Sequence, residues 1–473
     1  MRIVGGVWFG TAPSRSRLGK TAFSRRARFR EKRVFEKSAF PSRAREQAVS
    51  PKGKGIVMRQ SIGWMIVTLG LVQGAWAQTP AALTWQQVRV KFEAANPALR
   101  AGQINIDESR AAEITAYLRP NPGFSFVADQ FQPFSVQPYR PLAAAEPLIG
   151  LNYLHEREHK RELRRDSAVE ATAITVAQQT DLIRTLVFSL RTAFVATLQQ
   201  KAVLALAKDN LDYFDRELKI GRDRLTAGDI AKVDMKRLEL QRVQYESDYQ
   251  TALVNLRTAK IQLLQLLNDR QPVDQFDVTG PFEFSDRILP LDEFRRMALD
   301  ARPDLKAAVE AIAKAKTDHR LAVSNGSTDP TFTFDAGHNP PLTGYIGFGI
   351  QIPIRIFDRN QGEKLRTQLD IGHAEKVKDL TQAQVFADVD SAYVAAVSSV
   401  ELLKPYRDTY LQLARDVRDT MEYSYQHGQA ALVDYLDAQR DYRATFVAYL
   451  NLVGAYLTAA GQLNLAVGSE VIQ

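Results

Sequence analysis

The chain has 473 residues, enough for two or three ordinary domains, and a formal net charge of +8. The charge is unevenly distributed: residues 1–57 hold 15 of the 62 Lys and Arg residues but only 3 of the 54 Asp and Glu residues, whereas residues 78–473 carry a net charge of −5. The basic balance is therefore no argument for nucleic-acid binding. The sequence contains no cysteine, which excludes disulfides and a lipid attached to a cysteine.

The N-terminal segment predicts export. We expect residues 1–57 to be a basic extension that is untranslated or disordered. Residues 58–77 have the pattern of a secretory signal peptide, with an arginine, the apolar run Ile62–Val72 and an Ala75-Trp76-Ala77 cleavage site, so cleavage is expected after Ala77. The run is too short to cross a membrane, which takes about 20 apolar residues. We expect no spanning helix after Gln78, so any membrane crossing would use strands.

The mature chain begins with a predicted repeat one, residues 78–267. A capping box at Thr84 opens a short helix, and Asn96-Pro97 ends it and starts a second helix. Alternation of apolar with small or polar residues then predicts a β-hairpin over about 122–155. A long helical hairpin follows, from about 157 to 224 and from about 230 to 267. Residues 268–289 form a linker rich in proline, glycine and aromatic residues.

The second half repeats this order over residues 290–468. The residue pattern of Leu83–Ala101 recurs 206 positions later in Leu289–Ala307. The pattern of Gly228–Asp234 recurs 200 positions later in Gly428–Asp434. Repeat two therefore predicts two short helices, a hairpin over about 330–354 and a long helical hairpin, followed by a tail at 469–473. Tyrosines every seven residues along the last helix predict a coiled-coil seam.

These elements predict a mainly α-helical fold with a small β portion. The strands have about 8 to 11 residues, the length that a tilted strand needs to cross a bilayer. The alternative is the edge of a soluble β-sandwich, but four strands are too few to build one. Paired long helices packed as coiled coils are the expected structural role of the helical stretches.

The complete order resembles the TolC family of outer-membrane efflux channels, over about residues 80–468. The most specific local match is Pro353–Gly362, between the second strand and the long helix of repeat two, which is similar to a segment found in family members of heavy-metal efflux systems. The resemblance implies a homotrimer whose four strands per chain close a 12-stranded barrel in outer-membrane lipid. It further implies a tunnel of long helices in the periplasm, a periplasmic adaptor protein and an inner-membrane pump.

The same resemblance implies a gate at the helical tip. Asp434 and Asp437 match two aspartates that face the pore, and their spacing of three puts both on one helix face. Trimeric rings of these carboxylates would favour cations. Their alternative role is that of surface acids near a helix N-terminus.

Other tip residues match the family less completely. Asp234 and Tyr425 correspond to a contact that holds the tip closed, but Ala430 stands where the family has an arginine, so the closing network is open to question. Gly228 and Gly428 are expected to form the tip turns and to contact the adaptor.

No enzyme, cofactor or metal site is predicted. His155 and His159 have metal-ligand spacing, but they lie within a charged segment and are expected to be solvated. The remaining alternatives are a secreted coiled-coil scaffold or adaptor and the outer-membrane channel of a type I protein secretion system. The transported substrate, whether metal ion, drug or polypeptide, cannot be inferred from these residues.

Overall fold

The computed structural model describes residues 82–130, 134, 138, 145–339 and 342–472. These residues belong to one compact unit, Ala75–Gln473. The expected N-terminal extension (1–57), the signal peptide (58–77) and its cleavage after Ala77 lie outside the described residues.

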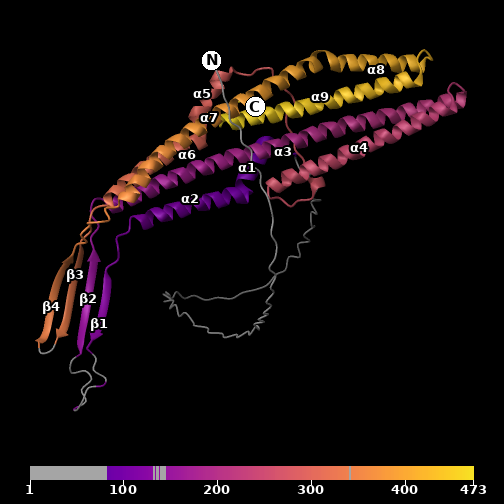
Figure 1. The fold of residues 1–473 in the computed structure, drawn as a ribbon. Coiled ribbons are helices and arrows are strands. Elements are labelled where there is room, and N and C mark those ends of the chain that lie inside the picture. The colour runs from indigo at the N-terminus through magenta and orange to yellow at the C-terminus, as the bar shows by residue number, and fades with distance from the viewer. Residues whose placement is uncertain (1–81, 131–133, 135–137, 139–144, 340–341, 473) are drawn as a thin grey trace, which may run out of the picture. The chain divides into compact units, whose positions relative to one another are not determined.

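Each half of the chain has short helices, two strands and long helices, in that order (Figure 1). The first half contains α1 (Trp85–Ala95), α2 (Pro97–Ala116), β1 (Gly123–Asp129), β2 (Glu146–Leu154), α3 (Lys160–Ala227), α4 (Lys232–Leu266) and the 3₁₀ turn η1 (Val273–Gln275). The second half contains α5 (Leu291–Ala301), α6 (Pro303–Ser324), β3 (Thr331–Asn339), β4 (Leu342–Gln351), α7 (Gln361–Pro405), the π-helical turn η2 (Tyr406–Tyr410), α8 (Leu411–Gln426) and α9 (Leu432–Val467).

The short helices begin where the sequence supplies caps. The Thr84 side chain accepts a hydrogen bond from the backbone N–H of Gln87, and the Gln87 side chain accepts one from the backbone N–H of Thr84, so the predicted capping box is present. The Asn96 side chain accepts from the backbone N–H of Ala98 at 2.9 Å, and Pro97 occupies the first position of α2, where no N–H is needed. These caps fix the angle at which the chain enters α2.

The four strands form one antiparallel sheet in the order β1-β2-β3-β4. The register places Phe124 opposite Leu151, Leu151 opposite Phe334 and Phe334 opposite Phe348. The two hairpins are therefore neighbours although they are about 200 residues apart in sequence. Figure 1 shows the sheet at one end of the long helices and the turns α3–α4 and α8–α9 at the other end.

The long helices run side by side between these two ends. Helix α3 has 68 residues, which corresponds to about 100 Å. It packs along α2, α4, α6 and α9, while α7 packs along α6 and α9. Pro405 divides the expected run 361–427: proline lacks the N–H that would bond to the preceding turn, and the chain widens into η2 before α8 begins.

Equivalent side chains build a core in each half. In the first half Val88, Phe194 and Leu263 join α1, α3 and α4. In the second half Phe294 and Leu463 belong to the cluster that joins α5, α7 and α9. The duplicated sequence pattern thus specifies a duplicated core, which sets the spacing of the long helices.

Helix α9 corrects one expectation. We expected no apolar helix of membrane-spanning length after Gln78, but within the described residues Leu432–Val467 meets the length and hydropathy criteria for a membrane span. Residues such as Val453, Tyr456 and Leu463 of this helix are buried against α3, α7 and the inter-repeat segment. Core packing between long helices thus accounts for the 33% of this apolar window that is buried.

Candidate functional site

Two glycines form the turns at the tip, as expected from the sequence pattern. Gly228 ends α3 with φ of 86°, and Gly428 lies in the turn after α8 with φ of 72°. In both turns the next N–H bonds back to a carbonyl five residues earlier: Asp229 to Arg224 at 2.8 Å and Gln429 to Ser424 at 2.7 Å. Only glycine adopts this left-handed backbone without a Cβ penalty. The two turns therefore have a clear structural role.

The two candidate gate aspartates share one exposed face of α9. Asp434 and Asp437 are exposed, whereas Tyr435 between them is fully buried. Asp437 pairs with Arg440 at 3.4 Å, one helical turn further along. Asp434 forms no ion pair with any described residue of its own protomer. The geometry therefore leaves both carboxylates at the surface near the tip, as a pore-lining role requires.

Asp234 and Tyr425 lie near each other but are not joined by a hydrogen bond in the described residues. Asp234 pairs instead with Arg237 at 3.7 Å on its own helix. The ring of Tyr425 stacks on Tyr435 with centroids 5.1 Å apart and planes 11° apart. Burial raises the pKa of Tyr425; Arg224 opposes this shift, and the charge of Asp234 adds to it. The expected pair thus belongs to a larger cluster.

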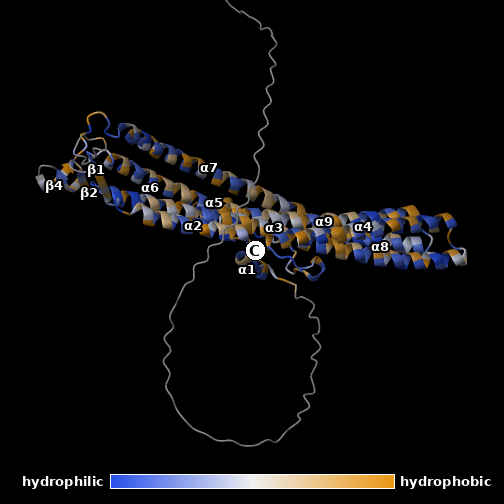
Figure 2. Cartoon of the chain, turned by 90° about the horizontal axis from the view of Figure 1, so that it is seen from below, coloured by the Kyte–Doolittle hydropathy of each residue, from blue (hydrophilic) through white to orange (hydrophobic). Residues whose placement is uncertain are grey.

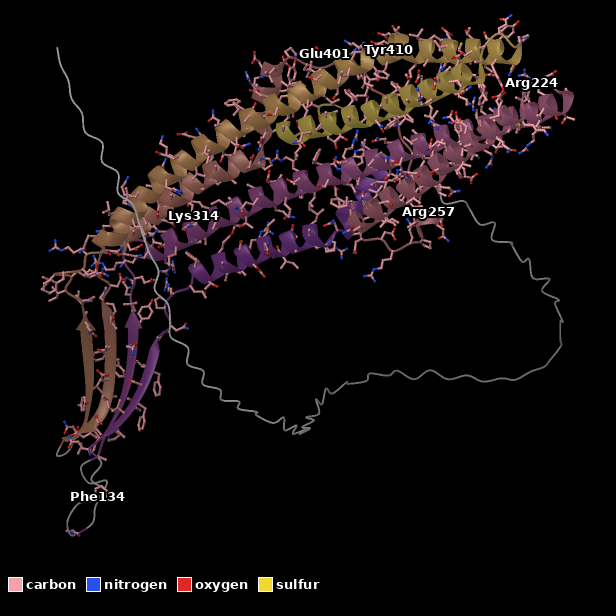
Figure 3. The ribbon with its side chains drawn as sticks, turned by 45° about the vertical axis from the view of Figure 1, so that its right-hand side comes forward. Phe134, Arg224, Arg257, Lys314, Glu401 and Tyr410 are labelled. Atoms are coloured by element: carbon pink, nitrogen blue, oxygen red, sulfur yellow. The ribbon has the colours of Figure 1, made fainter. Side chains whose placement is uncertain are left out.

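Arg224 on α3 of repeat one contacts Tyr425 of repeat two, and no sequence pattern indicated this residue. Its guanidinium carbon lies 5.2 Å from the centroid of the Tyr425 ring, and Nη1 donates to the Tyr425 carbonyl at 3.5 Å. Figure 3 shows Arg224 at the tip of the helical region, at the end away from the strands. Arg224 therefore supplies a cation beside Tyr425, whereas Ala430 has none to offer.

A buried polar network continues from the tip along the helices. Tyr213 on α3 donates to the Glu422 carboxylate on α8 and accepts from the Gln439 amide on α9 at 3.1 Å. Burial is the main cause that raises the pKa of Tyr213 and of Tyr435. The network links the two helical hairpins, and because its members are distant in sequence, no spacing rule could have found it.

Glu217 on α3 adds a buried carboxyl group to this region. Its side chain is almost completely covered. Burial raises its pKa, repulsion from Glu422 raises it further, and Gln426 and Arg224 are among the groups that oppose the shift. A single buried glutamate among helical polar residues gave no distinguishing signal in the sequence.

The sheet at the opposite end has two chemically different faces. Because paired residues point to the same side, the register assigns each side chain to one face. One face is apolar and carries Phe124, Phe126, Ile149, Leu151, Tyr153, Phe332, Phe334, Ala336, Ile346, Phe348 and Ile350. The other face is mainly small or polar and carries Ser125, Gly150, Asn152, Thr333, Asp335, Gly347 and Gly349, together with the larger residues Val127, Leu148, Leu154 and Tyr345.

Most of the apolar face has no packing partner in the protomer. Phe124 is 69% exposed and Phe348 is 84% exposed. The outer edges of β1 and β4 are also unpaired within the described residues, because these strands end the sheet on either side. Exposed apolar area of this size is usually covered by lipid or by another protein surface. Free strand edges usually pair with further strands or are otherwise protected.

The two discounted histidines lie at the junction of β2 and α3. The His155 ring packs edge-on against Phe332 at 6.4 Å, and His159 is the residue before α3, with φ of 55°. They belong to the charged connection that joins strand to helix in repeat one.

Comparison with known proteins finds a family match in the second half of the chain. The model of the family described as "Outer membrane efflux protein" matches residues 295–469. The chain is similar to this family over that part of its length. It is 24% identical over 294 residues to the cobalt-zinc-cadmium resistance protein CzcC of Cupriavidus metallidurans, a match that covers 58% of this chain and 66% of that protein. It is 23% identical over 282 residues to the outer membrane protein TolC of Escherichia coli, covering 56% of this chain and 57% of that protein.

The sequence matches thus span less than two thirds of the length of these two relatives. Solved structures match a larger part of the chain, and they show the similarity of the fold. A crystal structure of CusC superposes with a TM-score of 0.70 at 18% identity, covering 84% of this chain and 95% of that chain. The open state of the MtrE channel of Neisseria gonorrhoeae gives 0.68 at 18% identity, covering 82% and 89%. The expected fold class, long paired helices with a small β portion, is confirmed.

Proposed function

We propose that this chain is the outer-membrane channel of a tripartite efflux system, a passive conduit without enzymatic activity. One observation carries the proposal: a four-stranded sheet has a continuous apolar face, an opposite face that is mainly small or polar, and two edges that are unpaired within the described residues. In lipid every backbone polar group needs a partner, so a sheet must close on itself. Strands with alternating apolar and polar sides are the arrangement found in transmembrane barrels, where the apolar side faces lipid.

Closure requires further copies of the chain. Four strands are too few to close a barrel alone, and three copies give the twelve strands expected from the sequence. In this homotrimer β4 of one protomer pairs with β1 of the next. Residues 78–267 and 290–468 of each copy then act as two similar structural units, so that six units surround one axis. The partly exposed apolar length of α9 supports the same assembly, because neighbouring protomers would cover it.

The tip would be the periplasmic entrance. Asp434 and Asp437 would form stacked rings of carboxylates, which attract cations and repel anions. Asp234 and Tyr425, together with Arg224, would hold the tip closed, and the turns at Gly228 and Gly428 would contact a periplasmic adaptor. An inner-membrane pump would supply the substrate and the energy.

Export and substrate complete the proposal. The signal peptide 58–77 would direct the chain across the inner membrane and be cleaved after Ala77. The relative CzcC is a cobalt-zinc-cadmium resistance protein. Together with the segment Pro353–Gly362, this favours a metal or drug pump of the resistance-nodulation-division class over a type I secretion system.

Membrane fractionation of a Gram-negative host that expresses the full chain tests the proposal. We expect the protein in the outer membrane, with a mature N-terminus at Gln78 and the mass of three chains after detergent extraction. Recovery in the soluble periplasm would support the alternative of a coiled-coil scaffold and would contradict the channel.

A further inference from the structure

The connection between β4 and α7 exposes an unusual set of apolar side chains. Ile354 is 84% exposed, Ile356 is 62% exposed and Phe357 is 90% exposed. Figure 2 shows hydrophobic colouring in this connection before the hydrophilic start of α7. Contiguous apolar surface on an ordered segment marks an interaction site, because water contact with it is unfavourable.

Hydrogen bonds hold this segment in one conformation. The Gln361 side chain accepts from the Arg359 N–H at 2.8 Å and donates to the Phe357 carbonyl at 3.1 Å. Asn360 has a left-handed backbone with φ of 62°, and its amide donates to the Ala322 carbonyl of α6 at 2.7 Å. The apolar side chains are therefore presented on a fixed scaffold, anchored to the helical part of the protomer.

The exposed residues directly follow the apolar face of the sheet in sequence. In β4 the even-numbered residues Phe348 and Ile350 belong to that face. After the strand ends, Ile352, Ile354 and Ile356 keep the same parity and stay exposed. A surface that is covered by lipid along β4 would thus be extended beyond the end of the sheet, toward the helices.

Two arginines accompany the apolar residues. Arg359 is exposed and Arg355 is partly exposed, and neither forms an ion pair with another described residue; the Arg359 Nε donates to the Arg355 carbonyl at 3.4 Å. Guanidinium groups bind phosphate oxygens through several N–H donors at once. The charge of Arg355 helps to lower the pKa of Asp329, although the two side chains form no ion pair. Apolar side chains beside arginines without an ion pair fit the boundary between acyl chains and phosphate headgroups.

The corresponding connection in repeat one, between β2 and α3, is held by different contacts. Lys160 is only 3% exposed, pairs with Asp329 at 2.6 Å and donates to the Ser327 carbonyl at 3.0 Å. Glu156 in the same connection is paired with Arg164. Repeat one therefore uses its junction for ion pairs within the protomer, whereas the repeat-two junction is held by hydrogen bonds and keeps its apolar side chains exposed.

We propose that Ile352–Arg359 is an interfacial anchor that inserts into the phospholipid leaflet on the helical side of the barrel. Ile354, Ile356 and Phe357 contact the acyl-chain boundary, and Arg355 and Arg359 bind headgroup phosphates. The anchor would fix the height of the barrel in the membrane and resist vertical displacement when the tip is engaged. This inference rests on the proposed outer-membrane location.

Tryptophan fluorescence in proteoliposomes with brominated phospholipids tests the anchor. The mature chain contains one tryptophan, Trp85, so a Trp85→Phe background permits single reporters. Phe357→Trp reports on the anchor, Phe348→Trp on the sheet, and Leu380→Trp, 69% exposed on α7, on a helical surface away from lipid. We expect bromolipid to quench Phe357→Trp and Phe348→Trp at least twofold more strongly than Leu380→Trp.

The reporters separate the anchor from the channel. If Phe348→Trp is quenched while Phe357→Trp behaves like Leu380→Trp, the anchor proposal is contradicted, whereas the proposed membrane location of the sheet is supported. A blue-shifted but unquenched Phe357→Trp spectrum would mean that a second protein copy covers the segment, which also contradicts the anchor. Absence of quenching at Phe348→Trp would overturn the outer-membrane location and the anchor together.

A second arm tests the headgroup contacts. In the Phe357→Trp background, quenching should be stronger in brominated vesicles rich in phosphatidylglycerol than in brominated phosphatidylcholine vesicles. Replacing Arg355 and Arg359 by glutamine should remove that difference. Lys376→Gln, a change of one exposed charge on α7, serves as the matched control and should leave the difference intact. An unchanged lipid preference in the arginine variant would contradict the role of the two guanidinium groups.

Discussion

The guanidinium of Arg224 on α3 lies over the ring of Tyr425 on α8, with 5.2 Å between its central carbon and the ring centroid. One residue comes from each half of the chain, so the contact joins the two helical hairpins next to their turns. Nη1 of the same arginine donates to the Tyr425 carbonyl at 3.5 Å. Any separation of the two hairpins at the tip must break both interactions.

Replacing Arg224 by alanine should therefore favour the open tip. A cation–π contact of this kind contributes about 1–2 kcal/mol when it is partly desolvated, which corresponds to roughly a 5–30-fold change in the ratio of closed to open states. Single-channel recording in planar bilayers should show longer openings or larger conductance. Arg222→Ala removes an exposed arginine two residues away and should have little effect. Equal behaviour of the two variants would exclude a specific role for Arg224.

Neutralising both gate aspartates should weaken cation selectivity. With Asp434→Asn and Asp437→Asn, six carboxylates of the proposed trimer lose their charge, and the permeability ratio of K⁺ to Cl⁻ should fall toward 1. Reversal potentials in a KCl gradient measure this ratio. Asp441→Asn, one turn further along the same helix and exposed, is the control. Selectivity that survives the double substitution would place the two aspartates outside the pore.

The buried carboxyl of Glu217 should make tip stability depend on pH. Its folded pKa is raised above the unfolded value by burial and by repulsion from Glu422. The ionised form therefore penalises the folded state: the penalty is absent below the unfolded pKa and complete above the folded pKa. Stability from this group should fall as pH rises through that window.

Glu217→Gln should remove this dependence. Thermal unfolding of the detergent-solubilised protein should show a higher Tm for the variant at pH 8, and the difference should shrink on acidification toward pH 4. Glu239→Gln, an exposed change on α4, should show no such trend. A Tm difference that is constant over this range would mean that the carboxyl of Glu217 does not titrate differently in the folded state.

Two arginines form ion pairs with aspartates of α7, and replacing each by alanine should lower the stability of the fold to a different extent. Arg302 is 5% exposed, and its Nη1 bonds to Asp388 at 2.8 Å and to the Ala466 carbonyl at 3.2 Å. Arg302→Ala leaves the half-buried carboxylates of Asp304 and Asp388 without their donor and should cost about 1–3 kcal/mol. Arg295 makes a similar pair with Asp390 at 2.7 and 2.8 Å, but at the surface.

Arg295→Ala should therefore cost less than about 1 kcal/mol. Denaturant unfolding of both variants, followed by circular dichroism at matched protein concentration, measures the difference. Similar losses for the two substitutions would show that burial of Arg302 does not govern the strength of its ion pairs.

The sequence predicted local structure well because local structure depends on neighbouring residues. The capping box at Thr84, the break at Asn96-Pro97 and the alternation of Phe332 and Phe334 all determine conformation over a few positions. The same local rules identified Gly228 and Gly428 as turn residues. The family match and the fold of CusC-like channels agree with the architecture that followed from these signals.

The contacts between helices could not be predicted in the same way. Arg224 and Tyr425 are 201 positions apart, and Tyr213 and Glu422 are 209 apart, so only the folded chain brings each pair together. Pro405 shows a related limit: the sequence contains the proline, but whether the helix ends or widens into a π turn depends on the packing around it. The sequence pattern did not indicate an apolar stretch of membrane-spanning length in α9, because tyrosines and glutamine interrupt it.

Cross-linking of the sheet edges tests the central claim most directly. The chain has no cysteine, so pairs introduced on the polar face of the two edge strands, Ser125→Cys on β1 with Gly347→Cys or Gly349→Cys on β4, are the only thiols present. After mild oxidation in native outer membranes, denaturing non-reducing gels should show covalent dimers and a final trimer for one of the two pairs, with no larger species. Monomers alone with both pairs, or a ladder that continues beyond three chains, would contradict a barrel closed by three copies.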